Sequence, residues 1–355
     1  MKKLFLTSMA GFLGVFLVLV LFGGFAWSAE KKYELRYASE YMDKHPTVVN
    51  GILPWIQRVK DLSGGRLAIQ FFNPNTIAPA REAYSSVVAG SVDMTGSPCH
   101  FVRGKFPLSG AIQLPLIFNG AEAGSLTTWE IYQRYPEWRD EYKDVKLLWQ
   151  WTSALFELHT KNKLVRTLED LEGMKMIAWN PSIRRIIKDL GANPVEVTPH
   201  DTYLALERGM ADGVMCPLAP MKSFKITDAA KYHTIVDIMC DVFYGAMNMD
   251  KWESLPSDLQ KILEDTTRVK MAQICGKTLD EGAIKDANWM KSEGHTFYVL
   301  SPAEKKRWKE KVKGLHEEWM EMMEKKGYEN ARKIHDEVIR LGEQCSKTTT
   351  GGYKE

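Results

Sequence analysis

The chain has 355 residues, of which 45% are hydrophobic and 26% are charged, which is typical of a globular protein long enough for two domains. Its 47 basic and 45 acidic residues give a net charge of +2, which argues against nucleic acid or an anionic membrane surface as the main partner. The five cysteines are far apart and form no CxxC motif, so we expect buried thiols rather than a disulfide framework or a metal site.

The first 28 residues have the pattern of a secretory signal peptide. Lys2 and Lys3 precede an apolar run from Leu4 to Phe25, and Ala26-Trp27-Ser28 follows with the small residues that suit signal peptidase. The run is long enough to span a bilayer, so an uncleaved anchor is the alternative. We favour a cleaved signal. Removing the two lysines leaves 45 basic residues against 45 acidic ones, and the mature protein is expected in the periplasm.

The next segments alternate between strands and helices. Strands are predicted at 33–38 and 66–72, with a helix between them from Pro46 to Leu62 that Ser63-Gly64-Gly65 ends. A helix over 80–89 then leads into a strand at 91–96. This β-α-β-α-β order favours parallel strands in a sheet covered by helices.

The pattern repeats in the second half of the chain. Strands are predicted at 145–151, 155–161, 174–179, 193–197 and 211–217, with helices at 181–191 and 200–209. Two α/β units joined by more than one crossing predict a two-lobed α/β protein with a cleft between the lobes. Ligands of such sheets bind beyond the carboxyl ends of the strands.

The last hundred residues are predicted to be helical. Apolar residues recur at helical intervals over 256–294, which is too long for one lobe, so this helix either crosses both lobes or breaks. Another helix starts at Ser301, with Glu304 completing its cap, and a final helix covers 331–341. Residues 346–355 are expected to be a flexible tail.

No enzyme signature is present: the sequence has no GxSxG, P-loop, HExxH or GxGxxG motif. His100 follows Cys99, but neighbouring residues on a strand point in opposite directions, so we expect no catalytic pair there. The chain is expected to be neither an enzyme nor a metal or cofactor protein.

A series of segments nevertheless resembles one family along nearly the whole chain, from about Tyr33 to Leu341. The segments are, in order, "HP" at 45–46, "SGGRLAIQFF", "VVAGSVDMTG", "LPLIF", "TLEDLEGMKM", "LGANPVEV", "YLALERGMADG", "AAKYHT" and "MNMDKWESLPSDLQKIL". Their order and spacing are similar to those of the solute-binding proteins of tripartite ATP-independent periplasmic (TRAP) transporters, the DctP family.

The resemblance implies a periplasmic-binding-protein-like fold of two lobes joined by crossing strands and one long kinked helix. Residues 29–152 and about 243–285 would form lobe I, and residues 153–242 and about 286–345 would form lobe II. It also implies a monomer that closes on a small-molecule solute and delivers it to the permease subunits of a membrane transporter.

The resemblance further implies a binding site in which the family's usual carboxylate clamp is missing. An arginine of the family corresponds to Ile177, and a second one corresponds to Glu157 by ungapped counting. Met215 stands at an acidic position of the family and Cys216 at the polar position that follows it. Only Asn180 keeps a polar side chain of the type that binds ligand.

The residues themselves suggest a different site chemistry. Trp149, Trp151 and Trp179 lie near strand ends and are candidates for stacking on a ligand, with simple packing as the alternative. Glu40, Glu157 and Asp241 are candidates for accepting hydrogen bonds from an amine, with ordinary salt bridges as the alternative. His100, next to Cys99, completes the set of ligand-binding candidates.

A carboxylate ligand stays possible at this stage. Asn180-Pro181-Ser182 begins a helix whose free N–H groups face the cleft, and Arg103, Arg184 or Arg185 is a substitute for the missing arginine. We therefore predict a TRAP solute-binding protein for an aromatic or indole-type acid or amino acid. The alternatives are a binder of an amine or cation, and an exported sensor or scavenging protein of the same fold.

Overall fold

A computed structural model describes residues 31–354. The predicted signal peptide at 1–28 lies outside the described residues. Within residues 31–354, no helix is both long and apolar enough to cross a membrane. All five cysteines are free, and four of them are buried, as the sequence predicts.

The first lobe is built on a five-stranded sheet in the order β2-β1-β3-β10-β4. Strand β1 pairs in parallel with β2 and β3, which confirms the predicted β-α-β-α-β unit, and β10 pairs antiparallel with β3 and β4. The bounds are β1 (Tyr33–Ser39), β2 (Leu67–Phe72), β3 (Met94–Pro98), β4 (Val145–Thr152) and β10 (Val242–Asn248).

The second lobe is built on a six-stranded sheet in the order β11-β9-β5-β8-β6-β7. Strands β6, β7 and β8 are parallel, as are β9 and β11, while β5 is antiparallel to β8 and β9. The bounds are β5 (Glu157–Thr160), β6 (Lys175–Ala178), β7 (Asn193–Glu196), β8 (Gly213–Cys216), β9 (Tyr232–Ile235) and β11 (Thr296–Val299).

Helices cover both sheets. Those of the first half are η1 (Val48–Ile52), α2 (Leu53–Leu62), η2 (Ala80–Glu82), α3 (Ala83–Val88), η3 (Cys99–Phe101), η4 (Leu108–Ala111), α4 (Ala121–Arg134) and α5 (Pro136–Asp140). The second lobe carries α6 (Leu168–Leu171), α7 (Pro181–Asp189), η5 (Pro199–Asp201), α8 (Thr202–Glu207), α9 (Pro220–Ser223) and α10 (Ile226–Ala229). The later helices are α11 (Met249–Ser254), α12 (Ser257–Thr266), α13 (Val269–Ser292), α14 (Pro302–Val312), α15 (Gly314–Lys325) and α16 (Ala331–Thr348).

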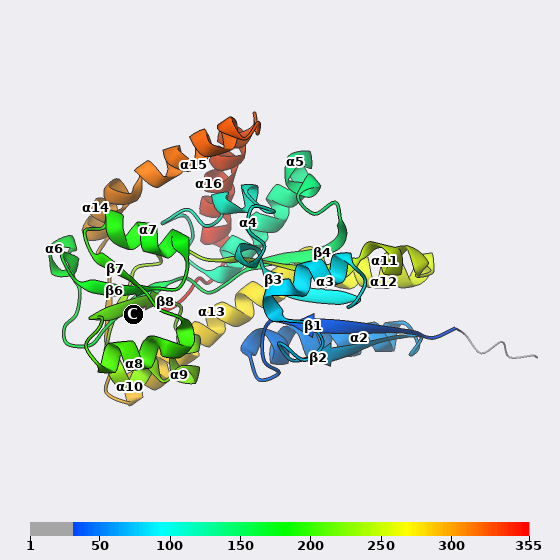
Figure 1. The fold of residues 1–355 in the computed structure, drawn as a ribbon, viewed down its shortest axis with the longest axis horizontal. Helices are drawn as coiled ribbons and strands as arrows, with labels where there is room; N and C mark the ends of the chain where they lie inside the picture. Colours follow the sequence, from blue (N-terminus) through cyan, green and yellow to red (C-terminus); the bar gives the residue numbers. More distant parts are fainter. Residues whose placement is uncertain (1–30, 355) are drawn as a thin grey trace, which may run out of the picture.

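The overlong helix of the prediction both breaks and crosses the lobes. It breaks between α12 and α13 at Arg268, whose φ is 58°. The first half of α13 buries Met271 and Cys275 in the core of the first lobe, and its second half buries Ala287 and Met290 in a core of the second lobe. In Figure 1, α13 (yellow) runs diagonally from the centre of the view, near β3, to the lower left, near α9 and α10.

Two antiparallel crossing segments also join the lobes, one leading from β4 to β5 and the other from β9 to β10. They are hydrogen-bonded to each other: Ser153 N donates to Asp241 O at 2.8 Å, and Phe156 N donates to Met239 O at 2.8 Å. The two-lobed α/β fold with crossing strands and a long spanning helix is therefore confirmed. The C-terminal helices form a further connection, because α14 packs against α6 and α7 of the second lobe whereas α15 and α16 pack against η4 and α4 of the first. Hinge motion between the lobes therefore involves these helices as well as the crossing segments and α13.

The C-terminal end differs from the expected flexible tail at 346–355. Helix α16 continues through Thr348, and Tyr353 is 6% exposed, with its ring 5.2 Å from that of Phe297. Composition suggested disorder, but the buried ring anchors these residues to the second lobe.

Candidate functional site

The candidate site lies where strand ends of the two sheets approach each other. Glu40 directly follows β1, and His100 lies in the turn after β3. Asp241 precedes the antiparallel strand β10, so it lies at the same edge of that sheet. Asn180 comes from the second lobe, between β6 and α7. Four of the predicted ligand-binding residues therefore come from the segments that border the cleft.

Asp241 is the centre of this group. Asn180 Nδ2 lies 3.4 Å from both of its carboxylate oxygens, Gln113 Nε2 lies 3.5 Å from Oδ1, and His100 Nδ1 lies 3.7 Å from Oδ1. The backbone of Asp241 is held in the crossing segment, where its N–H donates to Ser153 Oγ at 3.0 Å. Burial raises the pKa of Asp241, although His100 and Asn180 partly offset that effect.

Glu40 is the second carboxylate of the site. Its backbone N–H donates to Gly96 O at 3.2 Å, which continues the pairing of β1 with β3. Its Oε2 atom is buried and has no hydrogen-bond partner. Burial raises the pKa of Glu40 well above the usual value, and the charge of Asp241 raises it further. The two carboxylates are therefore close enough to influence each other.

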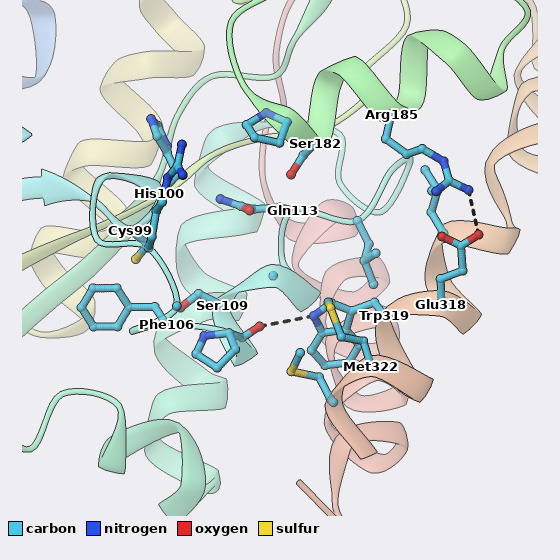
Figure 2. Close-up of a pocket in the computed structure, with 18 of the residues that line it drawn as sticks. Cys99, His100, Phe106, Ser109, Gln113, Ser182, Arg185, Glu318, Trp319 and Met322 are labelled. Atoms are coloured by element: carbon cyan, nitrogen blue, oxygen red, sulfur yellow. Dashed lines mark hydrogen bonds and ion pairs between the residues drawn. The ribbon is translucent and has the colours of Figure 1, made fainter. Parts of the chain in front are cut away.

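A cavity of about 640 Å³ opens beside this group. Its wall comes from the loop after β3, the first turns of α7 and one face of α15, with Cys99, His100, Arg103, Phe106, Gln113, Pro181, Ser182, Arg185, Trp319 and Met322 among the lining residues. Figure 2 shows His100, Gln113 and Ser182 near one end of the cavity, with Trp319 and Met322 on α15 bordering the other. The volume suits a small organic molecule. The far wall presents Leu315, Trp319, Met322 and Met323, together with the charged Glu318 and Lys326.

The start of α7 is built as the sequence predicts. Asn180 is its N-cap and accepts a hydrogen bond from Ile183 N at 2.8 Å, and Pro181 occupies the first turn. The same Asn180 side chain reaches Asp241 through its amide nitrogen, so one residue both caps the helix and bridges the lobes. Gly191, at φ 94°, ends this helix unit as expected.

Of the three arginines considered as substitutes, two are already paired. Arg184 NH1 lies 2.9 Å from Glu196, and Arg185 binds both Asp189 and Glu318. Arg103 lines the cavity, and no ion pair of its guanidinium is found among residues 31–354. Lys326 lines the cavity as well, and no ion pair of its ammonium group is found within 31–354, so Arg103 and Lys326 are both available cations of the cavity wall.

Trp149 and Trp151 do not reach the cavity, so the packing alternative describes both. They are 0% and 1% exposed in the core of the first lobe, with their rings 6.0 Å apart. The stacking continues from Trp151 to Phe243 at 5.2 Å and from Phe243 to Tyr41 at 5.5 Å. The two tryptophans therefore support the aromatic residue, Tyr41, that lies next to Glu40.

Trp179 is also engaged within its own lobe. Its indole N–H donates to Thr202 Oγ1 at 3.0 Å, and its ring makes an edge contact with Phe224 at 6.0 Å. It is partly buried and is not among the residues that line the cavity. Its position just before Asn180 nevertheless keeps it at the edge of the second lobe that faces the cleft.

The remaining predicted residues lie inside the second lobe. Ile177, Met215 and Cys216 are fully buried, and the carbonyl of Cys216 accepts a hydrogen bond from His159. Glu157 Oε2 accepts hydrogen bonds from the backbone N–H groups of Val236 and Asp237, at 2.5 and 3.0 Å. Glu157 therefore holds the turn that leads into the crossing segment, and these four residues do not join the cavity.

Gln113 and Tyr41 lie at the candidate site but were not predicted from the sequence. Gln113 lines the cavity and contacts Asp241, but its loop has no periodic pattern that would have singled it out. Tyr41 stacks on His45 with ring centroids 3.7 Å apart. The signal for Tyr41 was its position directly after Glu40 at the end of the first strand.

Two features of the described residues concern metal binding and the reactivity of Cys99. No group of three or more His, Cys, Asp and Glu side chains within 31–354 is arranged to hold a metal ion. Cys99 is buried, its Sγ lies 3.4 Å from the hydroxyl of Tyr142, and burial raises the pKa of its thiol to about 12. Its sulfur is therefore protonated near neutral pH and is a poor nucleophile.

Comparison with known proteins shows a match over most of the chain. Residues 38–324 match the model of the family "Bacterial extracellular solute-binding protein, family 7", DctP. A solute-binding protein of Roseobacter denitrificans is 22% identical over 84% of this chain and 90% of its own length. The 2,3-diketo-L-gulonate-binding periplasmic protein of Escherichia coli is 24% identical over 66% of this chain and 72% of its own length.

Solved structures of TRAP solute-binding proteins have the same fold. A protein from Desulfovibrio salexigens in an open form has a TM-score of 0.81 at 28% identity, covering 91% of this chain and 98% of its own. A Rhodoferax ferrireducens protein with benzoate and a marine metagenome protein with 3-hydroxybenzoate each have a TM-score of 0.81 at 24% identity, covering 89% of this chain and 99% of theirs.

Proposed function

The chain belongs to the bacterial extracellular solute-binding protein family 7, and from this premise we propose that it captures an aromatic organic solute between its lobes for a TRAP-type membrane permease. The observation that carries the proposal is the meeting of Asn180, from the second lobe, with Asp241, in the crossing segment, beside a cavity of about 640 Å³. A solute bound there touches both lobes, so its binding energy favours the closed arrangement.

An aromatic body for the solute is supported by the cavity wall. Phe106, Trp319 and Met322 give the cavity large apolar and polarizable surfaces. The structurally similar proteins with bound benzoate and 3-hydroxybenzoate show that this fold accommodates aromatic rings. The missing arginines at Ile177 and Glu157 argue against a simple dicarboxylate, because no guanidinium stands at either position to form a bidentate ion pair.

The same proposal includes the compartment in which the protein acts, its oligomeric state and its partners. Curated relatives are periplasmic binding proteins, and a signal peptide in residues 1–28 would export this chain to the periplasm. We propose that the protein acts as a monomer, without a nucleic-acid partner, and catalyses no reaction. The alternative function is an exported sensor or scavenger, which would hand the same solute to a receptor instead of a permease.

A thermal-shift screen of the purified protein tests the proposal. The panel contains aromatic carboxylates, aromatic amino acids and aromatic amines, each next to a non-aromatic analogue of the same charge, together with dicarboxylates and sugar acids. We expect stabilisation by aromatic compounds alone. Stabilisation only by dicarboxylates or sugar acids would contradict the proposed solute. Uptake assays with the permease from the same organism separate the transport role from the sensor role.

A further inference from the structure

At the inner end of the cavity, His100 and Gln113 stand between the cavity and Asp241, and neither Asp241 nor Glu40 is itself a lining residue. These two carboxylates bear on the charge of the solute. Glu40 and Asp241 have no Lys or Arg within ion-pair distance among residues 31–354. His100 is the only basic side chain that approaches either carboxylate in this part of the chain, and its 3.7 Å separation from Asp241 is too long for a hydrogen bond. Buried carboxylates in proteins are normally paired with a cation or well supplied with donors.

Neither carboxylate has its hydrogen-bonding capacity filled. Oε2 of Glu40 is buried and has no partner. The side chain of Asp241 is 11% exposed, and the side-chain donors that reach it are neutral amides at 3.4 to 3.5 Å, which are long contacts. Other acids in this protein contrast with them: Glu157 accepts two backbone N–H groups at 3.0 Å or less.

Asp241 contacts two residues of the cavity wall. His100 and Gln113 line the cavity and are at the same time the residues that touch Asp241. A polar group of the solute that passes between these two side chains meets Asp241 directly. The cavity therefore ends one side chain short of Asp241, and Asp241 and the neighbouring Glu40 set the charge behind this inner end.

We propose that this inner end binds a protonated nitrogen of the solute, with Glu40 and Asp241 as its partners. This inference rests on the proposed function and narrows its solute class to aromatic amines and amino acids. An ammonium group supplies three donors and a positive charge, which match the unfilled acceptors and relieve the repulsion between the two carboxylates. The aromatic body then extends toward Phe106 and Trp319.

Tyr41 adds a second contribution. Its ring packs against His45 and Phe243, and after burial the charges of Glu40 and Asp241 are the next largest causes that raise the pKa of its hydroxyl. Because His45 covers one face of the ring, Tyr41 would meet a cation through its hydroxyl oxygen or through its other face. A carboxylate of the solute, where present, is left to Arg103 at the rim.

The test uses three probes that share one ring system: tryptamine, tryptophan and indole-3-acetate. Isothermal titration calorimetry on the full purified protein should give at least tenfold tighter binding of tryptamine and tryptophan than of indole-3-acetate. In Glu40→Gln, we expect tryptamine affinity to fall at least tenfold and indole-3-acetate affinity to stay the same or rise. Glu281→Gln is the matched control, because Glu281 is an exposed acid on α13, 66% accessible, and should change neither.

A second measurement, the release of protons on binding, stays informative even where one variant folds poorly. Because both acids have raised pKa values, binding of an ammonium group should release protons, which titrations in two buffers of different ionisation enthalpy detect. Asp241→Asn should reduce that release. Tighter binding of indole-3-acetate than of tryptamine, or proton release unchanged in both acid variants, would overturn the inference while leaving aromatic solute capture intact. Absence of binding by every aromatic probe would instead refute the proposed function.

Discussion

A chain of histidines runs across the sheet of the second lobe. Lys231 Nζ lies 3.0 Å from His295 Nε2, His295 Nδ1 lies 2.8 Å from His233 Nε2, His233 Nδ1 lies 2.8 Å from His159 Nδ1, and His159 Nε2 lies 3.0 Å from the carbonyl oxygen of Cys216. A carbonyl only accepts and an ammonium only donates, so one set of neutral tautomers satisfies every bond. An added proton would place two N–H donors face to face.

These hydrogen-bonded histidines predict that the protein loses stability in acid. Burial lowers the pKa of His159 to about 4 and also lowers that of His233. The folded state thus binds fewer protons than the unfolded state, so stability is full above the unfolded pKa of about 6.5 and falls as pH drops toward 4, by up to about 3 kcal/mol for His159. Urea unfolding at several pH values should show a shallower slope between pH 6.5 and 4 for His159→Gln than for the wild type. Equal slopes would contradict this assignment.

Substitution of a buried tryptophan should lower stability without changing solute affinity, and substitution of the cavity-lining methionine should do the reverse. Trp149→Phe removes part of a fully buried ring, so we expect a loss of unfolding free energy smaller than the ~3–5 kcal/mol typical of a buried Trp→Ala change, and no change in solute affinity. Met322 lines the cavity and is 46% exposed, so Met322→Ala should stay within about 0.5 kcal/mol in stability while weakening solute binding. Denaturant unfolding and calorimetry on both variants measure the two effects, and a reversed pattern would contradict the placement of Trp149.

At the candidate site, the sequence identified some residues but not the depth at which each side chain lies. Glu40, His100, Asn180 and Asp241 could be predicted because they follow strands, begin a helix or lie at a lobe crossing. Trp149 and Trp151 lie two residues apart on one strand, so the sequence predicts that they share one face of the sheet. It does not tell whether that face meets a ligand or the core. The core behind the sheet buries them. Gln113 became visible only once tertiary packing placed its loop against Asp241.

Among the elements, α13 matters most because it connects both lobes and packs closely on α4. A Cβ added to Gly276 would lie 2.6 to 2.8 Å from the backbone of Ala121 and Glu122, so the two helices approach closely at this glycine. The carboxylate of Asp280 accepts hydrogen bonds from the backbone N–H groups of the same two residues, at 2.7 and 2.9 Å. Together, these contacts hold the start of α4 against the middle of α13.

Two glycines of α13 provide a matched test. Gly276→Ala forces the helices apart, so we expect a loss of about 1–3 kcal/mol or more of unfolding free energy. Gly282→Ala has only side-chain atoms of Pro46, at 3.9 Å, near its new methyl group, so we expect a gain of roughly 0.5–1 kcal/mol from helix propensity. Thermal or denaturant unfolding of both variants checks the pair. Equal effects would contradict the close packing of α13 on α4.

For the whole molecule, the first parallel unit and the two-lobed design were predictable, whereas the inner strand β10, between β3 and β4, was not. All seven residues of β10 are buried, so its sequence has no alternation of exposed and buried positions to reveal it. A break was one of the two expected outcomes, but its position at Arg268 was equally hidden, because helical spacing of apolar residues continues on both sides of it. Both features depend on how the lobes pack together rather than on local pattern.

The central claim is that one nitrogen-bearing aromatic solute bridges the two lobes and closes them. Small-angle X-ray scattering of the purified protein, with and without saturating tryptamine, tests it most directly. We expect the radius of gyration to fall on binding for the wild type and for Glu281→Gln, but not for Asp241→Asn at the same tryptamine concentration. Binding of tryptamine without compaction, or equal compaction in Asp241→Asn, would contradict the claim.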